Sequence, residues 1–513
     1  MATEGERTGL GLSRWVGLGL LLVSLLVQVA LEGGLNPPWR RLWFDTLQQV
    51  HPRERPADPP AVVIAIGESS LRTFGQWPWP RDLMAELVLR LQNAGVRAVG
   101  VDILFNEPDR LSPARMADWF GAADPDLAER IAAFGDTDQR LAEAMAQSNV
   151  VLPIAGLKGE VPEPNRTEIN PAVTLDNVAP GELISIPASL RSLPVLQRAA
   201  AGQASIYFDN LPDNIVRAVP AVKVIDGAPA LLLGPESLRA AEEAFFATVT
   251  PARMGLEVDL ETLSFPTERN GLFWIHFGRT GGLEDGASDP RYIPAASVLN
   301  GDIDPRRLSG KIALLAVTGL GTVDSQTTSL AEEVWGIEAH LQMIEQILAQ
   351  DFLRRPSEIF LIETAVLGLV GLLLIQLIPR APPVSSLAVT GATVVAVAGI
   401  SYVAFRSGWL VDGSGPALGI TITAVGLIGA SLIERDRERQ IQERERAALL
   451  AAAKSMQQSV LPEESFEVAG RVRLAAHLTP AFDVGGDLYD HFLLEDGLLF
   501  FLVGDVSGKG VAA

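Results

Sequence analysis

Residues 359–378 read IFLIETAVLGLVGLLLIQLI, and this stretch decides the fold class. An apolar run of ~20 residues is long enough to cross the hydrocarbon core of a bilayer as a helix. Its one charged residue, Glu363, lies near the predicted outer end. A carboxylate within a membrane segment is a candidate functional group, but this position favours a side chain that reaches the interface. The stretch therefore predicts a transmembrane helix.

Further apolar runs predict three more spans: Trp15–Leu31, Val384–Phe405 and Trp409–Ile433. The first run resembles a signal peptide, but no small-residue cleavage site follows it, so residues 1–34 are expected to form an uncleaved signal anchor. Short connections separate the last three spans, which predicts a compact antiparallel bundle over residues 358–433. Buried helices of a soluble protein are the alternative, but three such segments in a row rarely fit one core.

Four spans place both termini on one side of the membrane and residues 32–358 on the other. Arginines gather just after the last span, at 435, 437, 439, 444 and 446, which favours a cytoplasmic location for that end. Arg40-Arg41 and Arg354-Arg355 oppose this orientation, but long loops translocate largely regardless of charge. We therefore expect a multi-pass protein of the inner (cytoplasmic) membrane, with cytoplasmic termini and residues 32–358 extracytoplasmic.

Composition agrees with a soluble domain joined to a few spans. Of the 513 residues 48% are hydrophobic, and the mean hydropathy is +0.23. The net charge of -21 argues against a nucleic-acid partner. The absence of cysteine excludes disulfides, thiolate metal sites and a cysteine nucleophile.

Residues 35–357 alternate between strand-like and helix-like patterns. The continuous apolar run 61–66 (AVVIAI) predicts a strand buried on both faces, as in a parallel sheet. Helical periodicity follows over 81–93, with Gly95 as a C-terminal cap. A strand over 96–101, a helix over 127–147 and a strand over 150–154 come next, and 311–318 with 337–350 repeats the unit. This order predicts an α/β domain.

Several motifs in this region resemble the second family of CHASE-type extracellular sensor domains. They are Trp77-Pro78-Trp79-Pro80-Arg81, 101–108 (VDILFNEP), 213–217 (DNIVR), Gly310-Lys311-Ile312 through Asp324, and 336–340 (GIEAH), in the family's order. The resemblance implies a sensing role for residues 40–357 and leaves the ligand unknown. The sequence departs from the family at Gly67, where an acid commonly follows the first strand.

Three residues are candidates for ligand binding: Trp77, Trp79 and Asp102. Asp102 follows a predicted parallel strand, and α/β sheets bind ligands at the carboxyl ends of such strands. A buried structural aspartate is the alternative there. The two tryptophans would line a pocket, or would pack their proline-rich loop onto the core. The sequence 319–324 (GLGTVD) lacks the third glycine of a dinucleotide fingerprint and the lysine of a phosphate loop, which indicates a tight turn.

Residues 434–461 predict a helical linker, because they contain no glycine and no proline before Leu461 and carry opposite charges three or four residues apart. Ile441, Leu449, Met456 and Val460 fall on one stripe. The stripe suits a two-stranded signalling helix in a homodimer, or a single solvated helix, and both readings stay open. The linker contains no histidine, so a phosphoacceptor helix has no nucleophile there.

The remaining segment, 462–513, resembles the start of SpoIIE-type serine/threonine phosphatase domains of the metal-dependent PPM class. The resemblance rests on 457–462 (QQSVLP), 485–490 (GGDLYD) and 504–513 (GDVSGKGVAA). It implies an α+β domain with a two-metal Mn²⁺ or Mg²⁺ site, in which Asp487, Asp505 and the Val506 carbonyl are ligands and a bridging water attacks a phosphoserine. It also implies a phosphorylated protein of the anti-sigma-antagonist type as substrate.

A complete domain of this class needs ~100 residues beyond Ala513 and further aspartates. Residues 434–513 alone are therefore expected to lack phosphatase activity. Two functions follow for the chain. One is a receptor whose sensor regulates a cytoplasmic phosphatase, and the other is a non-enzymatic membrane sensor with an incomplete, inactive output.

Overall fold

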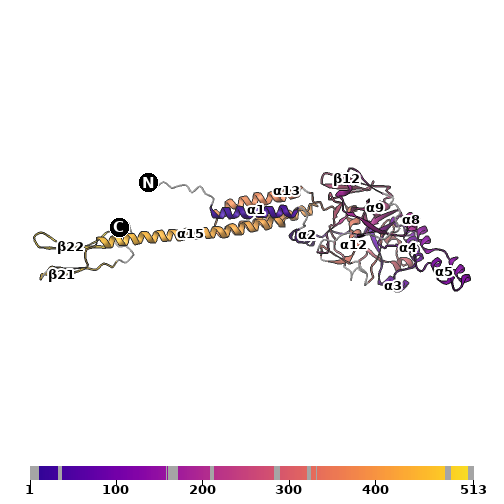
Figure 1. Cartoon of the computed structure of the whole chain (residues 1–513), viewed down its shortest axis with the longest axis horizontal. Helices are drawn as coiled ribbons and strands as arrows, with labels where there is room; N and C mark the ends of the chain where they lie inside the picture. Colours follow the sequence, from indigo (N-terminus) through magenta and orange to yellow (C-terminus); the bar gives the residue numbers. More distant parts are fainter. Residues whose placement is uncertain are drawn as a thin grey trace. The chain divides into compact units, whose positions relative to one another are not determined.

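The computed structural model describes residues 11–32, 37–157, 159, 172–207, 213–281, 289–319, 325–330, 332–356, 358–468, 470–479 and 487–506 (Figure 1). The chain divides into two compact units. One comprises residues 25–369 and 392–419 and contains the sensor-like α/β domain. The other comprises residues 1–24, 370–391 and 420–513.

A seven-stranded sheet forms the centre of the first unit, in the order β16-β1-β17-β2-β3-β6, with β7 also paired to β3. Its strands are β1 (Ala61–Ile66), β2 (Ala98–Val101), β3 (Val150–Leu157), β6 (Ala188–Arg191), β7 (Gly202–Ser205), β16 (Tyr292–Pro294) and β17 (Ile312–Val317). The neighbours from β16 to β3 run parallel, whereas β6 is antiparallel to β3. The predicted α/β class is therefore confirmed.

Both faces of this sheet are covered, which explains why β1 is apolar throughout. Val62, Ile64 and Ile66 join one core, and Ala61 and Val63 join the other. The first core is built with α3 (Glu68–Phe74), α4 (Arg81–Asn93), α7 (Thr137–Ala146) and α11 (Ala295–Asn300), and the second with α9 (Leu233–Ala241) and α12 (Ile337–Ala349). A parallel sheet needs helices on both faces because each strand alternates its side chains between them.

The single helix predicted over 127–147 is wrong, because the chain breaks there into α6 (Pro125–Ala132) and α7. Gly135 adopts a positive φ of 84°, and the Asp136 side chain accepts a hydrogen bond from the Asp138 N–H to begin the next helix. A left-handed glycine followed by an aspartate cap is a strong helix boundary. With α5 (Pro113–Gly121), α6 forms a hairpin that projects from the body of this unit (Figure 1).

The rest of the first unit consists of small sheets and short helices. The sheets have the orders β14-β13-β12-β4, β11-β10-β5, β19-β18-β8 and β15-β9. Their strands are β4 (Val173–Leu175), β5 (Ser185–Ile186), β8 (Ile215–Val216), β9 (Ala218–Pro220), β10 (Val222–Ile225), β11 (Ala228–Leu231), β12 (Ala247–Ala252), β13 (Gly255–Asp259), β14 (Ser264–Thr267), β15 (Leu272–Trp274), β18 (Ser325–Thr328) and β19 (Glu333–Trp335). The short helix α8 (Pro194–Ala199) precedes β7, and α2 (Pro38–Val50) precedes β1.

Within the described residues, four helices are long and apolar enough to cross a membrane: α1 (Leu12–Glu32), α13 (Ile359–Leu377), α14 (Pro383–Arg406) and α15 (Ser414–Val460). They expose large apolar side chains such as Leu26, Leu369 and Val395. Such surfaces suit a hydrocarbon environment and would be costly in water. The helices are therefore compatible with a membrane protein.

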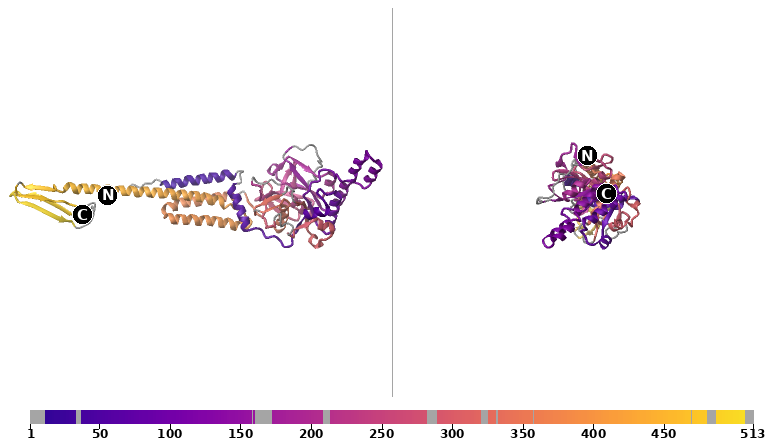
Figure 2. Two further views of the ribbon diagram at one scale, coloured as in Figure 1. Left: turned by 90° about the horizontal axis from the view of Figure 1, so that it is seen from below. Right: turned by 90° about the vertical axis from the view of Figure 1, so that its right-hand side faces the viewer.

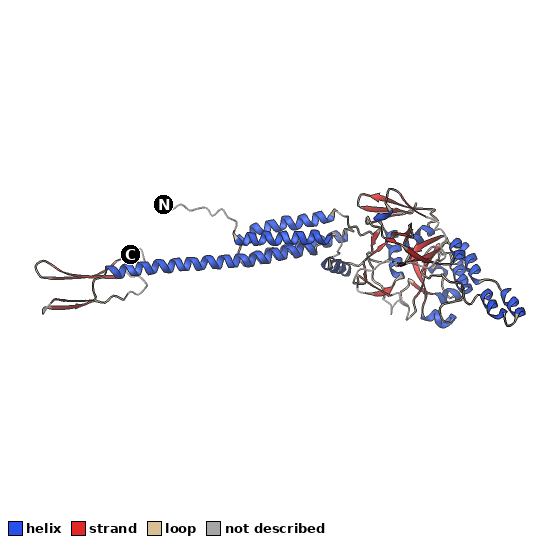
Figure 3. Cartoon of the chain, viewed as in Figure 1, coloured by secondary structure: helices blue, strands red, loops and turns tan. Residues whose placement is uncertain are grey.

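The last apolar helix differs from its predicted bounds. It begins at Ser414 rather than near Trp409, because the Asp412 carboxylate accepts hydrogen bonds from the Ser414 and Gly415 N–H groups at 2.9 and 3.3 Å. It then continues to Val460 as one helix that contains the predicted linker (Figure 2). Two hairpins follow in the second unit: β20 (Ser465–Val468) with β21 (Val472–Ala475), and β22 (Asp487–Leu493) with β23 (Leu499–Asp505) (Figure 3).

A pH dependence of stability follows from His340 on α12. Its side chain is buried, and this burial, together with the nearby Lys223 charge, lowers the pKa of His340 to about 3. An unfolded chain protonates this imidazole below its ordinary pKa of about 6.5, whereas the folded chain does not. The folded state therefore loses about 2 kcal/mol relative to the unfolded state between pH 7.5 and pH 5 through this group.

His340→Gln removes this contribution. We expect the difference in unfolding free energy between the wild type and this variant to fall by about 2 kcal/mol from pH 7.5 to pH 5. Urea titration of both proteins in detergent measures it. A difference that stays constant with pH would contradict a neutral, buried His340.

Candidate functional site

A cavity of ≈ 470 Å³ lies at the carboxyl ends of β2 and β17. The loop between α3 and α4 and the loop after β2 form its walls. All three predicted ligand-binding residues, Trp77, Trp79 and Asp102, line it, together with Arg81, Phe105, Glu107, Arg110 and others. Ligands of open α/β sheets bind at this edge, because the loops that follow parallel strands meet there.

The two tryptophans have different surroundings. Trp79 is 1% exposed, its indole N–H donates to the Gly75 carbonyl at 2.9 Å, and its ring contacts Phe74 edge-on. Trp77 is half-buried, with its ring centroid 6.2 Å from that of Trp79. Trp79 therefore fixes the loop onto the core, as the alternative reading held, while Trp77 presents ring surface to the cavity.

Arg81 and Asp109 hold the two walls together, and sequence reasoning assigned neither of them a role. The Arg81 N–H donates to Asp109 Oδ2 at 2.9 Å, and its guanidinium lies over the Phe105 ring, 4.4 Å from the centroid. Asp109 also accepts from the Thr137 hydroxyl at 2.8 Å. Arg81 pairs with Asp138 at 3.3 Å. Arg81 and Asp109 therefore stabilise the loop that forms this wall through contacts within the protein.

The rim of the cavity carries the exposed side chains Glu107 and Arg110, and Asp102 lies at the end of β2. An aromatic wall with ionisable groups of both signs suits a small polar molecule with a flat or apolar portion.

Gly67, where the family commonly has an acid, is followed directly by Glu68, the first residue of α3. A carboxylate therefore does follow β1, one residue later. Residues 320–324 of the predicted turn lie outside the described residues.

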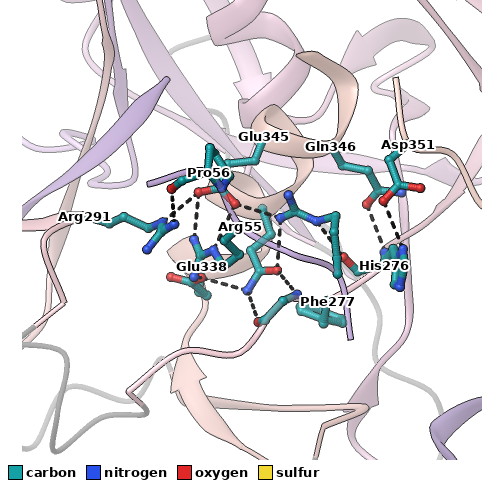
Figure 4. Close-up of polar contacts among 12 residues, drawn as sticks. Arg55, Pro56, His276, Phe277, Arg291, Glu338, Glu345, Gln346 and Asp351 are labelled. Atoms are coloured by element: carbon teal, nitrogen blue, oxygen red, sulfur yellow. Dashed lines mark hydrogen bonds and ion pairs between the residues drawn. The ribbon is translucent and has the colours of Figure 1, made fainter. Parts of the chain in front are cut away.

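A second feature was not predicted: a buried polar face on α12. Glu338, Gln342, Glu345 and Gln346 lie at helical spacing, and each is at most 2% exposed. Figure 4 shows Glu338 and Glu345 facing Arg55, which belongs to the segment that follows α2, and Gln346 beside His276. Polar residues at this spacing ordinarily form the solvated face of a helix, so the sequence carried no signal for the network.

Glu345 is the centre of this network. It accepts from Arg53 at 2.7 Å, from Arg55 at 2.9 and 3.0 Å, and from Arg291 at 2.9 Å. Burial alone would raise the pKa of Glu345, but the hydrogen bonds from Arg55 and the charges of Arg55 and Arg53 lower it. Glu345 is therefore a carboxylate at neutral pH.

Glu338 completes the pairing on the other side of the network. It pairs with Arg55 at 2.7 Å and accepts from the Tyr292 hydroxyl at 2.7 Å. The network joins α12 to residues 53–55, which follow α2. One of these segments leads into the domain from the apolar helix α1, and the other leads out of it to α13. We call the segment that follows α2 the α2 connection and the segment that leads from α12 to α13 the α12 connection. The ion pairs of the network therefore fix these two connections to each other.

Glu363 of α13 does not reach toward an interface, as its position had suggested. It is 2% exposed, pairs with Arg355 through two hydrogen bonds of 2.9 and 3.1 Å, and accepts from the Asp412 N–H at 2.6 Å. A buried carboxylate needs a partner, and Arg355, which had opposed the predicted orientation, supplies it.

In the second unit, the predicted metal ligands Asp487 and Asp505 form one register pair of the β22–β23 hairpin. Residues in such a pair lie on the same face, and two carboxylates placed there repel each other. A divalent cation held between them would offset this repulsion. Val506 follows β23 directly and is exposed. Among the described residues no group of three or more metal-ligating side chains occurs, and Gly485, Gly486 and residues 507–513 lie outside them.

An α/β domain joined to apolar helices is compatible with a membrane sensor. The CHASE2 domain matches residues 20–378, and the chain belongs to the CHASE2 family. CHASE2 domains are extracellular sensor domains, so the predicted sensing role is supported. No curated protein and no solved structure matches the chain.

Proposed function

We propose that the chain is a signal receptor of the inner (cytoplasmic) membrane that binds a small molecule in the cavity between Trp77 and Asp102. The observation that carries this proposal is the cavity itself, which lies at the ligand-binding edge of the central sheet and has a partly accessible aromatic ring in its wall. Residues 32–358 face the extracytoplasmic side, and both termini are cytoplasmic.

The output that we propose is a SpoIIE-type serine/threonine phosphatase that requires Mn²⁺ or Mg²⁺. The pairing of Asp487 with Asp505 across β22 and β23 supports it, because it brings together two hard oxygen donors that the resemblance names as ligands. The substrate would be a phosphorylated protein of the anti-sigma-antagonist type. A second copy of the chain would be a partner through α15, on which Ile441, Leu449 and Met456 are exposed. The alternative is a sensor without an enzymatic output, and the cavity is the observation that supports it.

The variant Trp77→Ala tests whether Trp77 binds the ligand or only packs its loop onto the core. We screen small polar and aromatic compounds for thermal stabilisation of the full-length protein in detergent, and measure their affinity for the variants. Trp77→Ala is expected to weaken a hit by about tenfold, since an aromatic pair contributes about 0.5–1.5 kcal/mol beyond the apolar area that it buries. Trp79→Ala should instead destabilise the domain itself by about 3–5 kcal/mol.

Asp102→Asn tests the charge of the cavity, because it removes the negative charge and keeps the size of the side chain. A hit that stabilises Trp77→Ala and Asp102→Asn as much as the wild type would show that the cavity is not its site.

A further inference from the structure

His276 follows β15 and makes two hydrogen bonds through its ring. Its side chain is 7% exposed. Nδ1 lies 3.1 Å from Asp351 Oδ2, and Nε2 lies 3.0 Å from the His51 carbonyl oxygen. Figure 4 shows the ring beside Asp351 and Gln346. Both ring nitrogens therefore have a hydrogen-bond partner at the same time.

The chemistry of these partners decides the protonation state. A backbone carbonyl only accepts, and so does an ionised carboxylate. The hydrogen bond from His276 lowers the pKa of Asp351, so this group remains a carboxylate throughout the range in which imidazoles titrate. A neutral imidazole has one N–H and can satisfy one of the two acceptors. Both contacts together require the imidazolium.

The two acceptors belong to different connections of the domain. His51 is the C-cap of α2, which leads into the domain. Asp351 comes directly after Gln350, the C-cap of α12, on the way to α13. When one proton leaves the ring, a lone pair faces an oxygen at one of these contacts, and that contact becomes repulsive. The protonated ring thus bonds to both connections, whereas the neutral ring loses one of these two contacts and leaves the Arg53–Glu345 pair in place.

The ring also packs against aromatic side chains and against a second imidazole, that of His51. Phe405 of α14 meets the ring edge-on at 5.3 Å, and Tyr402 of the same helix contacts the His51 ring. The His51 ring lies 6.1 Å away. Arg53 donates to the His276 carbonyl at 3.0 Å and is paired with Glu345 of α12. The positive charge of Arg53 is therefore offset within the α12 network, and Asp351 is the carboxylate that faces the ring.

We propose that His276 is a proton-binding site through which the sensor responds to the pH of the compartment that it faces. The protonated ring ties the α2 connection to the α12 connection through both contacts, and the neutral ring keeps one of them. This response is independent of any molecule in the cavity beside Trp77, and it acts on the same two connections that the buried α12 network fixes.

Two substitutions act in opposite directions. His276→Gln carries both of its side-chain N–H groups on one nitrogen and cannot place one at each acceptor as the ring does, so it should resemble the wild type at high pH under all conditions. Asp351→Asn places an amide opposite Nδ1, and its NH₂ group can donate to a neutral ring whose Nε2–H still reaches His51. Asp351→Asn should therefore keep the tie closed at both high and low pH. The opposite signs separate the proposal from a general loss of folding.

The full-length protein in detergent provides the measurement. Because the chain contains no cysteine, spin labels can be attached at Val50→Cys and Ala349→Cys, two exposed positions at the ends of α2 and α12. Distances are measured at about pH 5.5 and about pH 8.5, on either side of the ordinary imidazole pKa. We expect a narrow distribution at low pH and a broader or displaced one at high pH in the wild type, with no pH dependence in either variant.

Nitrogen-15 spectra of the labelled histidines give a second readout. The signal lost in His276→Gln should show two protonated nitrogens at about pH 5.5 and one at about pH 8.5, while buried His340 stays neutral at both. A His276 ring with one protonated nitrogen at low pH would overturn the proposal. So would a wild-type distance distribution that does not change with pH, or an Asp351→Asn protein that opens at high pH.

Discussion

Glu345→Gln is expected to destabilise the sensor domain by about 3–5 kcal/mol, which corresponds to a loss of roughly 6 °C or more in Tm. Arg53, Arg55 and Arg291 all direct guanidinium N–H groups at the Glu345 carboxylate, whose side chain is fully buried. An amide at this position removes the negative charge and turns an N–H group toward donors. The buried guanidiniums then lose a charge partner that water cannot replace.

Glu86→Gln is the control for this measurement. Glu86 pairs with Arg90 at 2.6 Å on the surface of α4, and about half of its side chain is exposed. Removal of its charge should cost about 0.5 kcal/mol or less, because solvent screens the pair. Thermal unfolding of both variants in detergent tests the difference. If Glu345→Gln were as mild as Glu86→Gln, the α12 network would not be the fixed joint between the two connections.

Asp505→Asn and Asp487→Asn are each expected to lower phosphoserine hydrolysis by at least ~100-fold in a protein that carries the whole output domain. Each change removes a charged oxygen donor while it keeps the size of the side chain. In the proposed site Asp487 and Asp505 would hold a dication that supplies a bound hydroxide, so loss of either charge would weaken metal binding and the rate should recover in part at high Mn²⁺. The measurement is hydrolysis of a phosphoserine peptide as a function of metal concentration.

Asp490→Asn is the internal control, and the hairpin gives the physical reason. Asp490 lies three residues after Asp487 in β22, so it lies on the opposite face of the strand. We expect a smaller effect from this variant. Normal rates and normal metal dependence in both the Asp487 and Asp505 variants would refute the phosphatase proposal, without consequence for the cavity or for His276.

Part of the candidate site was predictable. Trp77, Trp79 and Asp102 lie in motifs that resemble a sensor family, and the rule that ligands bind at the carboxyl ends of parallel strands placed Asp102. The structure brings all three to one cavity. The division between Trp79 in the core and Trp77 at the surface of the cavity could not be predicted, because both tryptophans stand in the same proline-rich setting. This division depends on which of the two indole rings donates its N–H to the Gly75 carbonyl and packs against Phe74.

Local patterns in the sequence determined β1, α4 and the apolar helices, because strand burial, helical periodicity and span length are properties of neighbouring residues. The break at Gly135 was missed, since the apolar period continues across it.

Only the tertiary structure decided that the polar face of α12 is buried. Its partners Arg53 and Arg55 lie about 290 positions away along the chain, and those of His276 lie 75 and 225 positions away. A polar face at helical spacing has the same sequence pattern whether water or guanidinium groups cover it. The ion pairs that allow this face to be buried form only when segments distant in the sequence pack together.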